Sequence, residues 1–274
     1  MKKVITALLA LTLLIGLSAC GGSDNSSKTS STASSSKATS STAATKSGNY
    51  TIPKAAGTIT VDGKINTDEW KGAYTSSFSA DSLKNGGGFA MNKKYTTGTA
   101  VKQYFLYTDD GLYLAFEVTD KTKAPGVAEG AALNATDAMQ ILFDIQNKKT
   151  NKENNTTAKE IYIFDFAPGT KADRTGPAAW FEHWIYNKMD SAVGIKVASV
   201  QSDNGYVLEV FMPWKSFSKG GETITGKSGM KFGMGSMILD CNSASAPIDI
   251  YGDFGTAFAS DYANASKYNT YTLA

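Results

Sequence analysis

Short apolar runs separated by turn residues restrict this chain, more than any other feature, to a fold built from many strands. In each run apolar and polar side chains alternate, with the period of two that marks a half-buried strand. Two pairs of runs flank a turn that ends in glycine, which predicts antiparallel hairpins. They are residues 103–107 and 112–118 around Asp109-Asp110-Gly111, and residues 195–200 and 206–212 around Asp203-Asn204-Gly205.

The other periodic segments fit the same all-β class. In the run 139–145 two sets of residues fall on opposite faces of a strand: Met139, Ile141, Phe143 and Ile145 against Gln140 and Asp144. Residues 161–166 and 230–239 add two strands, and only residues 178–189, behind Pro177, have helical spacing. We predict one domain over residues 49–274, an antiparallel, jelly-roll-like β-sandwich with one short helix.

The first residues are typical of a secretory signal peptide. Lys2 and Lys3 precede an apolar run over residues 4–17, too short to span a membrane stably. Leu17-Ser18-Ala19-Cys20 resembles the bacterial lipobox, which is cut before the cysteine. We therefore predict a signal peptide over residues 1–19, export across the cytoplasmic membrane, and attachment to the cell envelope by lipid on Cys20. The alternative is an ordinary signal peptide that happens to contain a cysteine.

A tether is predicted between this cysteine and the domain. Residues 21–47 are almost entirely Ser, Thr, Ala, Gly and Lys, without an aromatic residue to build a core. As a disordered coil, the segment 20–48 spans roughly 30 Å on average. The chain has 2 cysteines. Lipid on Cys20 leaves Cys241 without an intramolecular partner, so we expect the domain to fold without a disulfide.

Charge and motifs argue against nucleic-acid binding and against catalysis. A net charge of +2 gives no concentrated basic face for nucleic acid. The single histidine, His183, has no nucleophile motif such as GxSxG beside it. Glu160 and Asp165 lie five apart on a predicted strand and so alternate to opposite faces. We predict no catalytic residues, although a pair of carboxylates without another role stays open.

The order of several sequence phrases carries a family resemblance. They are TITVDGKINTDEWKGA (58–73), YTDDGLYLAFEVTD (107–120), DAMQILFD (137–144), GYVLEVFMPWKSF (205–217), GMKFGMGSMILDCN (229–242) and YNTYTL (268–273). Together they resemble the family 9 carbohydrate-binding modules, a DOMON-like β-sandwich. In physical terms, we expect Trp70 and Trp214 to pack in a core, and Pro213-Trp214 to end an edge strand. The resemblance implies that the domain binds an oligo- or polysaccharide.

The resemblance also implies a set of binding residues. The family holds a sugar between two tryptophans, and these positions correspond here to Asn134 and Tyr251. The family's strand glutamate corresponds to Gln140, and its polar strand positions correspond loosely to Tyr162 and Asp165. Trp180 and Trp184 lie four apart on the predicted helix, where they either stack on sugar or pack in the core. The predicted carbohydrate-binding set is Tyr251, Trp180, Trp184, Gln140, Tyr162 and Asp165.

Other interpretations of the domain's function remain open at this point. Some members of the sandwich superfamily bind haem, for which the candidate ligands are His183 with Met139, Met212, Met230, Met234 or Met237. A structural or adhesive surface module is a further alternative. No cofactor is certain from the sequence, but the resemblance implies structural calcium. The candidate calcium ligands are Asp120, Asp137, Asn242 and Asp253.

Overall fold

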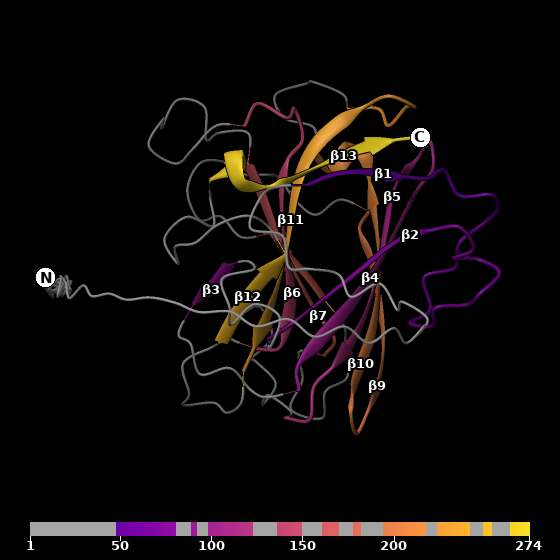
Figure 1. Ribbon diagram of the computed structural model, residues 1–274. Coiled ribbons are helices and arrows are strands. Elements are labelled where there is room, and N and C mark those ends of the chain that lie inside the picture. The colour runs from indigo at the N-terminus through magenta and orange to yellow at the C-terminus, as the bar shows by residue number, and fades with distance from the viewer. Residues whose placement is uncertain are drawn as a thin grey trace, which may run out of the picture. The chain divides into compact units, whose positions relative to one another are not determined.

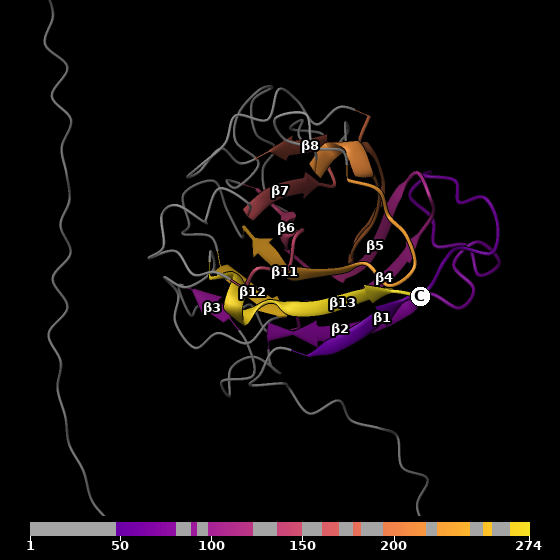
Figure 2. The same ribbon diagram turned by 90° about the horizontal axis from the view of Figure 1, so that it is seen from above.

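The computed structural model describes ten segments of the chain, which lie in its folded part. They are residues 48–80, 89–91, 98–122, 136–149, 161–169, 178–181, 194–217, 224–241, 249–253 and 264–274. Their strands form two sheets that face each other, as the predicted β-sandwich requires (Figures 1 and 2). The predicted signal peptide, Cys20 and the tether up to residue 47 lie outside the described residues.

The smaller sheet has five strands and is antiparallel throughout. Its order is β2-β4-β5-β10-β9, with the bounds β2 Tyr74–Ser79, β4 Ala100–Tyr107, β5 Gly111–Thr119, β10 Gly205–Pro213 and β9 Lys196–Ser202. Both predicted hairpins, β4–β5 and β9–β10, are confirmed. The expectation that Pro213 ends an edge strand is wrong, because β10 pairs with β5 on one side and β9 on the other.

The larger sheet has eight strands. Its main order is β1-β13-β11-β6-β7-β8, and β12 joins β11 to β3. The bounds are β1 Asn49–Ile52, β13 Asn269–Leu273, β11 Lys231–Asp240, β6 Ala138–Asp144, β7 Ile161–Ala167, β8 Ala178–Phe181, β12 Asp249–Asp253 and β3 Phe89–Met91. The pairing of β1 with β13 is parallel, and the other pairings are antiparallel.

The main core fills the space between the two sheets. Met139, Ile141 and Phe143 of β6 face it, as their alternation predicts, and each is fully buried. Trp214 is a member of this core, with 3% of its surface exposed. Trp70 is also buried, but it belongs to a separate cluster on the outer face of the five-stranded sheet. The prediction that both tryptophans pack in a core is confirmed.

The predicted helix over 178–189 is wrong at its first turn. Residues 178–181 form β8, which pairs antiparallel with β7, and residues 182–189 lie outside the described segments. Pairing with a sheet edge therefore outweighs local helical spacing over these four residues. The helices of the described segments include η3 Trp214–Phe217 and η5 Ala265–Lys267, both 3₁₀. No helix in these segments has the length and hydropathy needed to cross a membrane.

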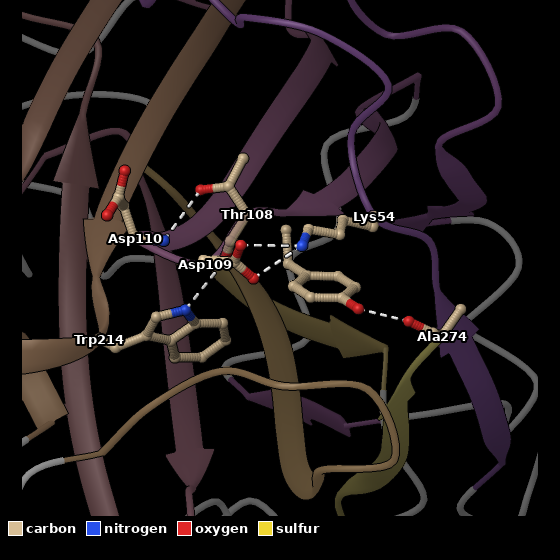
Figure 3. A network of polar contacts seen from close by, with 7 residues as sticks. Lys54, Thr108, Asp109, Asp110, Trp214 and Ala274 are labelled. Carbon is tan, nitrogen blue, oxygen red and sulfur yellow. Dashed lines mark hydrogen bonds and ion pairs between the residues drawn. The ribbon is translucent and has the colours of Figure 1, made fainter.

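The turn between β4 and β5 fastens distant parts of the chain together. Figure 3 shows the indole Nε1 of Trp214 donating to the Thr108 carbonyl at 3.0 Å, and Lys54 Nζ pairing with Asp109 at 2.7 Å. The Tyr107 hydroxyl donates to the carbonyl of Ala274. Asp109 is thus committed to the turn and its ion pair, which agrees with the turn role expected from the sequence.

Candidate functional site

A row of register positions on the eight-stranded sheet collects three of the predicted binding residues. Gln140 of β6 pairs with Asp165 of β7, and Asp165 pairs with Trp180 of β8. The side-chain amide of Gln140 donates from Nε2 to Asp165 Oδ1 at 2.8 Å. This bond joins the two polar side chains across the strand pair.

The row lies on the outer face of the sheet, away from the main core. Its neighbours in β6 and β7, Met139 and Phe166, belong to that core, and successive residues of a strand alternate between faces. Gln140 is 5% exposed and Asp165 is fully buried, so packing holds the two side chains in one geometry. A buried carboxylate is costly unless it is bonded or has a function, and this one accepts the amide of Gln140.

An apolar cluster adjoins the row on the same face. It consists of Leu142, Ile163, Met237, Ala265 and Tyr268, with Ile161 packed against it. Met237 pairs directly with Gln140, so the polar pair and the apolar cluster are continuous across the strands. Its five members are at most 6% exposed, so the cluster is a second, smaller core that stabilises the strands carrying the polar pair.

Tyr162, another of the predicted binding residues, is not a member of this row. It is 4% exposed and lies in the main core, where its ring packs at 5.7 Å from that of Phe217. Its hydroxyl donates to the Phe217 carbonyl at 2.6 Å. The side chain alternates to the opposite face from Asp165 along β7, so its role is to join this strand to η3.

Tyr251 also falls outside the row. It pairs with Ile238 of β11, which in turn pairs with Met139, whereas the row continues from Met237 to Gly252. Position 251 is therefore in line with core positions, one residue away from the row. Trp184 and Asn134 lie outside the described residues. Of the six predicted binding residues, the structure brings together Gln140, Asp165 and, by register, Trp180.

A second polar group lies between the two sheets at one end of the sandwich. Asp120 follows β5 of the five-stranded sheet, Asp137 precedes β6, and Asp240 ends β11 of the eight-stranded sheet. All three are at most 3% exposed, and one carboxylate oxygen from each lies within 4.8 Å of the others. Thr99 donates to Asp240, and the backbone N–H of Cys241 donates to Asp137, each at 2.9 Å.

Three buried carboxylates so close together repel one another unless protons or a cation offset their charge. Oxygen-only ligands of this kind are those that Ca²⁺ takes in proteins, so the residues fit the calcium implied by the resemblance. Asp120 and Asp137 were predicted ligands, whereas Asp240 was missed. Asn242 lies outside the described segments. Asp253 pairs with Ser236, four residues along β11 from Asp240, about 13 Å away at 3.3 Å per residue.

The methionines considered as haem ligands pack among apolar side chains. Met139, Met212 and Met234 are in the main core and Met230 packs against it, while Met237 is in the outer cluster. Methionine fills irregular gaps in such cores, which accounts for these positions. His183 lies outside the segments that the structure describes, and so does Glu160, the partner considered for Asp165 in a catalytic pair.

Comparison with known proteins agrees with this architecture. The family model described as "Carbohydrate family 9 binding domain-like" matches residues 61–274. A family 9 module from Caldicellulosiruptor kristjanssonii in complex with cellotriose is similar in structure, with a TM-score of 0.55 and 14% identity over 82% of this chain and 93% of that one. A structure of a family 9 module from the same organism with glucose has a TM-score of 0.55 and 14% identity, over 82% and 95% of the chains.

A protein from Bacteroides uniformis shares the fold at a TM-score of 0.55 and 9% identity, over 83% of this chain and all of that one. At such identities the likeness shows a common fold. No protein with a curated description matches the chain.

Proposed function

This chain belongs to the carbohydrate family 9 binding domain-like family, and from that premise we propose that its domain binds neutral oligo- or polysaccharide without chemically changing it. The observation that carries the proposal is the bonded pair of Gln140 and Asp165 on the outer face of the eight-stranded sheet. Trp180 occupies the next register position, on β8. The similar modules from Caldicellulosiruptor kristjanssonii, which hold cellotriose and glucose, support the choice of ligand class.

Each member of the row has a role in this proposal. Gln140, which keeps 5% of its surface exposed, bonds to sugar hydroxyls, because an amide both donates and accepts, and the buried carboxylate of Asp165 holds that amide in position. The carboxylate of Asp165 repels a uronic acid, which favours neutral sugars. Trp180 supplies a flat apolar ring for the C–H face of a pyranose. The row has one carboxylate, bonded to an amide, whereas glycoside hydrolysis generally uses two, so the row supports a binding role.

Calorimetry with xylo-, cello- and manno-oligosaccharides tests the proposal. We expect weak but measurable binding to at least one series. Trp180→Ala should weaken it by about five- to thirty-fold, equivalent to about 1–2 kcal/mol for a lost stacking contact. Absence of binding to every neutral glycan at millimolar concentration would reject carbohydrate binding.

Tyr251→Ala and Trp184→Ala are the comparison variants. A loss of affinity with Trp180→Ala but not with Tyr251→Ala supports the row as the site. A loss with Tyr251→Ala alone would move the site away from the row, whose positions alternate with that of Tyr251. Equal binding by all variants and the parent would reject both locations.

We further propose that the protein is a lipoprotein that displays this domain outside the cytoplasmic membrane. Support comes from the Leu17-Ser18-Ala19-Cys20 sequence and the Ser/Thr-rich segment behind it. A tethered, non-catalytic module then keeps polysaccharide near the cell. An adhesive module would bind glycans through the same site. A purely structural module would have no affinity for glycans, so measuring that affinity distinguishes the two roles.

A further inference from the structure

The connection between β1 and β2 crosses the outer face of the five-stranded sheet as a strap, defined here as residues 56–73. It contains no strand and most of its residues are exposed. Three of them are buried: Ile59, Gly63 and Trp70. The strap covers a patch of the sheet that is separate from the main core, because the sheet itself lies between them.

One side chain fastens the strap. Glu209 of β10 is fully buried, and its Oε2 atom accepts three successive backbone N–H groups. These are the N–H groups of Asp62, Gly63 and Lys64, at 2.9, 2.7 and 3.2 Å. The other oxygen, Oε1, accepts the indole N–H of Trp70 at 2.8 Å. A carboxylate held by four donors is a strong anchor, since bonds to a charged acceptor are about twice as strong as neutral ones.

The remaining polar bonds of the strap are internal. The backbone N–H of Trp70 donates to the Asn66 carbonyl and that of Ala73 to the Trp70 carbonyl, while Asp68 N–H donates to the Asn66 side chain. In the described part of the chain, the hydrogen bonds from residues 56–73 to the sheet all end on Glu209. The strap thus has its own bonded structure and one polar fastening.

The apolar contacts of the strap are confined to one patch on the outer face of the five-stranded sheet. Ile59 and Trp70 pack on Leu106 and Ala115 in a cluster of their own, with the half-buried Tyr104 beside them. The Trp70 and Tyr104 rings meet edge to face at 6.2 Å. Regions with few buried contacts and many exposed backbone groups open separately from a domain core.

We propose that the strap is a conformational latch, which opens as a unit when the bonds of Glu209 break and thereby bares the apolar patch of Leu106, Ala115 and Tyr104. The sequence phrases 58–73 and 205–217 then act together in the latch. The Val-Asp-Gly turn and Trp70 of the first phrase supply the hydrogen-bond donors, and Glu209 of the second supplies the acceptor. The latch is independent of carbohydrate binding, because its residues belong to the other sheet.

Burial raises the pKa of the Glu209 carboxyl, and its bonds to Asp62, Trp70, Gly63 and Lys64 act in the opposite direction. The charged carboxylate is therefore buried at a cost that its four donors offset only in part. Losing those donors favours an opened strap with a hydrated carboxylate.

Hydrogen exchange of the full chain, followed by mass spectrometry, tests the latch with Glu209→Gln. In either orientation the glutamine amide places an NH₂ group against at least one N–H donor, so the cradle cannot be satisfied. We expect exchange in peptides from residues 58–73 to rise about ten- to a hundred-fold. Peptides from β6 and β7 should keep their rates.

Glu117→Gln is the matched control, because Glu117 lies on the same face of the sheet and bonds to Tyr104 and not to the strap. It should leave strap exchange unchanged. If Glu209→Gln does not fold, Trp70→Phe removes one of the four donors and should give a smaller increase confined to the strap. Unchanged strap exchange in the folded variant overturns the latch, and so does an equal increase in the strap and in β6 and β7.

Discussion

At the scale of one residue, the buried carboxylate of Asp165 is the group whose substitution distinguishes a role in sugar binding from a role in packing. Its carboxylate is fully buried on the outer face of the sheet, where it accepts the amide of Gln140 at 2.8 Å. A side chain needed only for packing is better served by an apolar residue of similar size, since burying a carboxylate carries a desolvation penalty. The proposed function gives this charge a use, which is to hold the Gln140 amide in position for a sugar.

Asp165→Asn tests that argument. Asparagine keeps the shape and can still accept the Gln140 amide, so the domain should stay folded and its melting temperature should change by only a few degrees. Removing the charge should lower the affinity for a bound oligosaccharide about ten-fold, because charge-assisted bonds contribute about 1.5–3 kcal/mol. Calorimetry and thermal melting measure the two effects. An unchanged affinity would show that the charge of Asp165 takes no part in sugar binding.

Tyr162→Phe should give the reverse result. It removes the hydroxyl that donates to the Phe217 carbonyl and leaves that buried carbonyl without this donor. We expect a loss of about 1–3 kcal/mol in the free energy of unfolding in urea, with sugar affinity unchanged. A fall in affinity without a loss of stability would return Tyr162 to the binding site.

At the scale of strands, turn chemistry and alternation made the two hairpins predictable. The turns 109–111 and 203–205 are local signals, and they join strands that pair along most of their length. The strand β8 was missed because its four residues also suit a helix, and only the edge of β7 decides between the two. The row of Gln140 and Asp165 depends on the register of β6 with β7, which no local pattern fixes.

The three aspartates show the same limit. Asp120 and Asp137 stand out in the sequence because each borders a strand. In the sequence, Asp240 stands at the end of an apolar strand, and only the pairing of β11 with β6 brings it close to Asp137. Contacts that depend on long-range pairing cannot be read from spacing along the chain.

Calcium should stabilise the domain through this cluster. At a concentration a hundred times its dissociation constant, Ca²⁺ adds about 2.7 kcal/mol to the free energy of unfolding. For a domain of this size that is roughly 5–10 °C in melting temperature, which EDTA should remove. Asp240→Asn should abolish the response to Ca²⁺, whereas Asp109→Asn, in an exposed turn, should keep it. A melting temperature indifferent to EDTA and Ca²⁺ would contradict a calcium site.

At the scale of the whole molecule, the predicted tether should be thermodynamically silent. Residues 21–47 carry no aromatic residue and little apolar surface, and the strands of the sandwich begin at Asn49. Deleting them should leave the melting temperature within about a degree or two, since surface segments without contacts contribute little. Thermal melting of the deleted and full-length chains makes the comparison. A large loss would mean that this segment packs on the domain.

Lipid attachment is tested separately. We expect the mature protein to begin at Cys20 and to partition into the membrane fraction, and Cys20→Ala to release it. Intact mass of the membrane-extracted protein identifies the first residue and any lipid. A soluble, unmodified product that starts elsewhere would contradict the lipobox interpretation, as would membrane partitioning that survives Cys20→Ala.

The parallel pairing of β1 with β13 has a mechanical meaning. If the protein is anchored as proposed, any pull between the cell and a captured polymer enters the domain at Gly48, whose N–H is bonded to Asn269 at 2.8 Å. The force then passes into β1, a four-residue strand at the edge of the sheet. The ring centroids of Tyr50 in β1 and Tyr271 in β13 lie 5.5 Å apart. Force along the strand axis loads the hydrogen bonds between β1 and β13 together, in shear. The strength of this four-residue pairing therefore sets the force at which the domain begins to unfold.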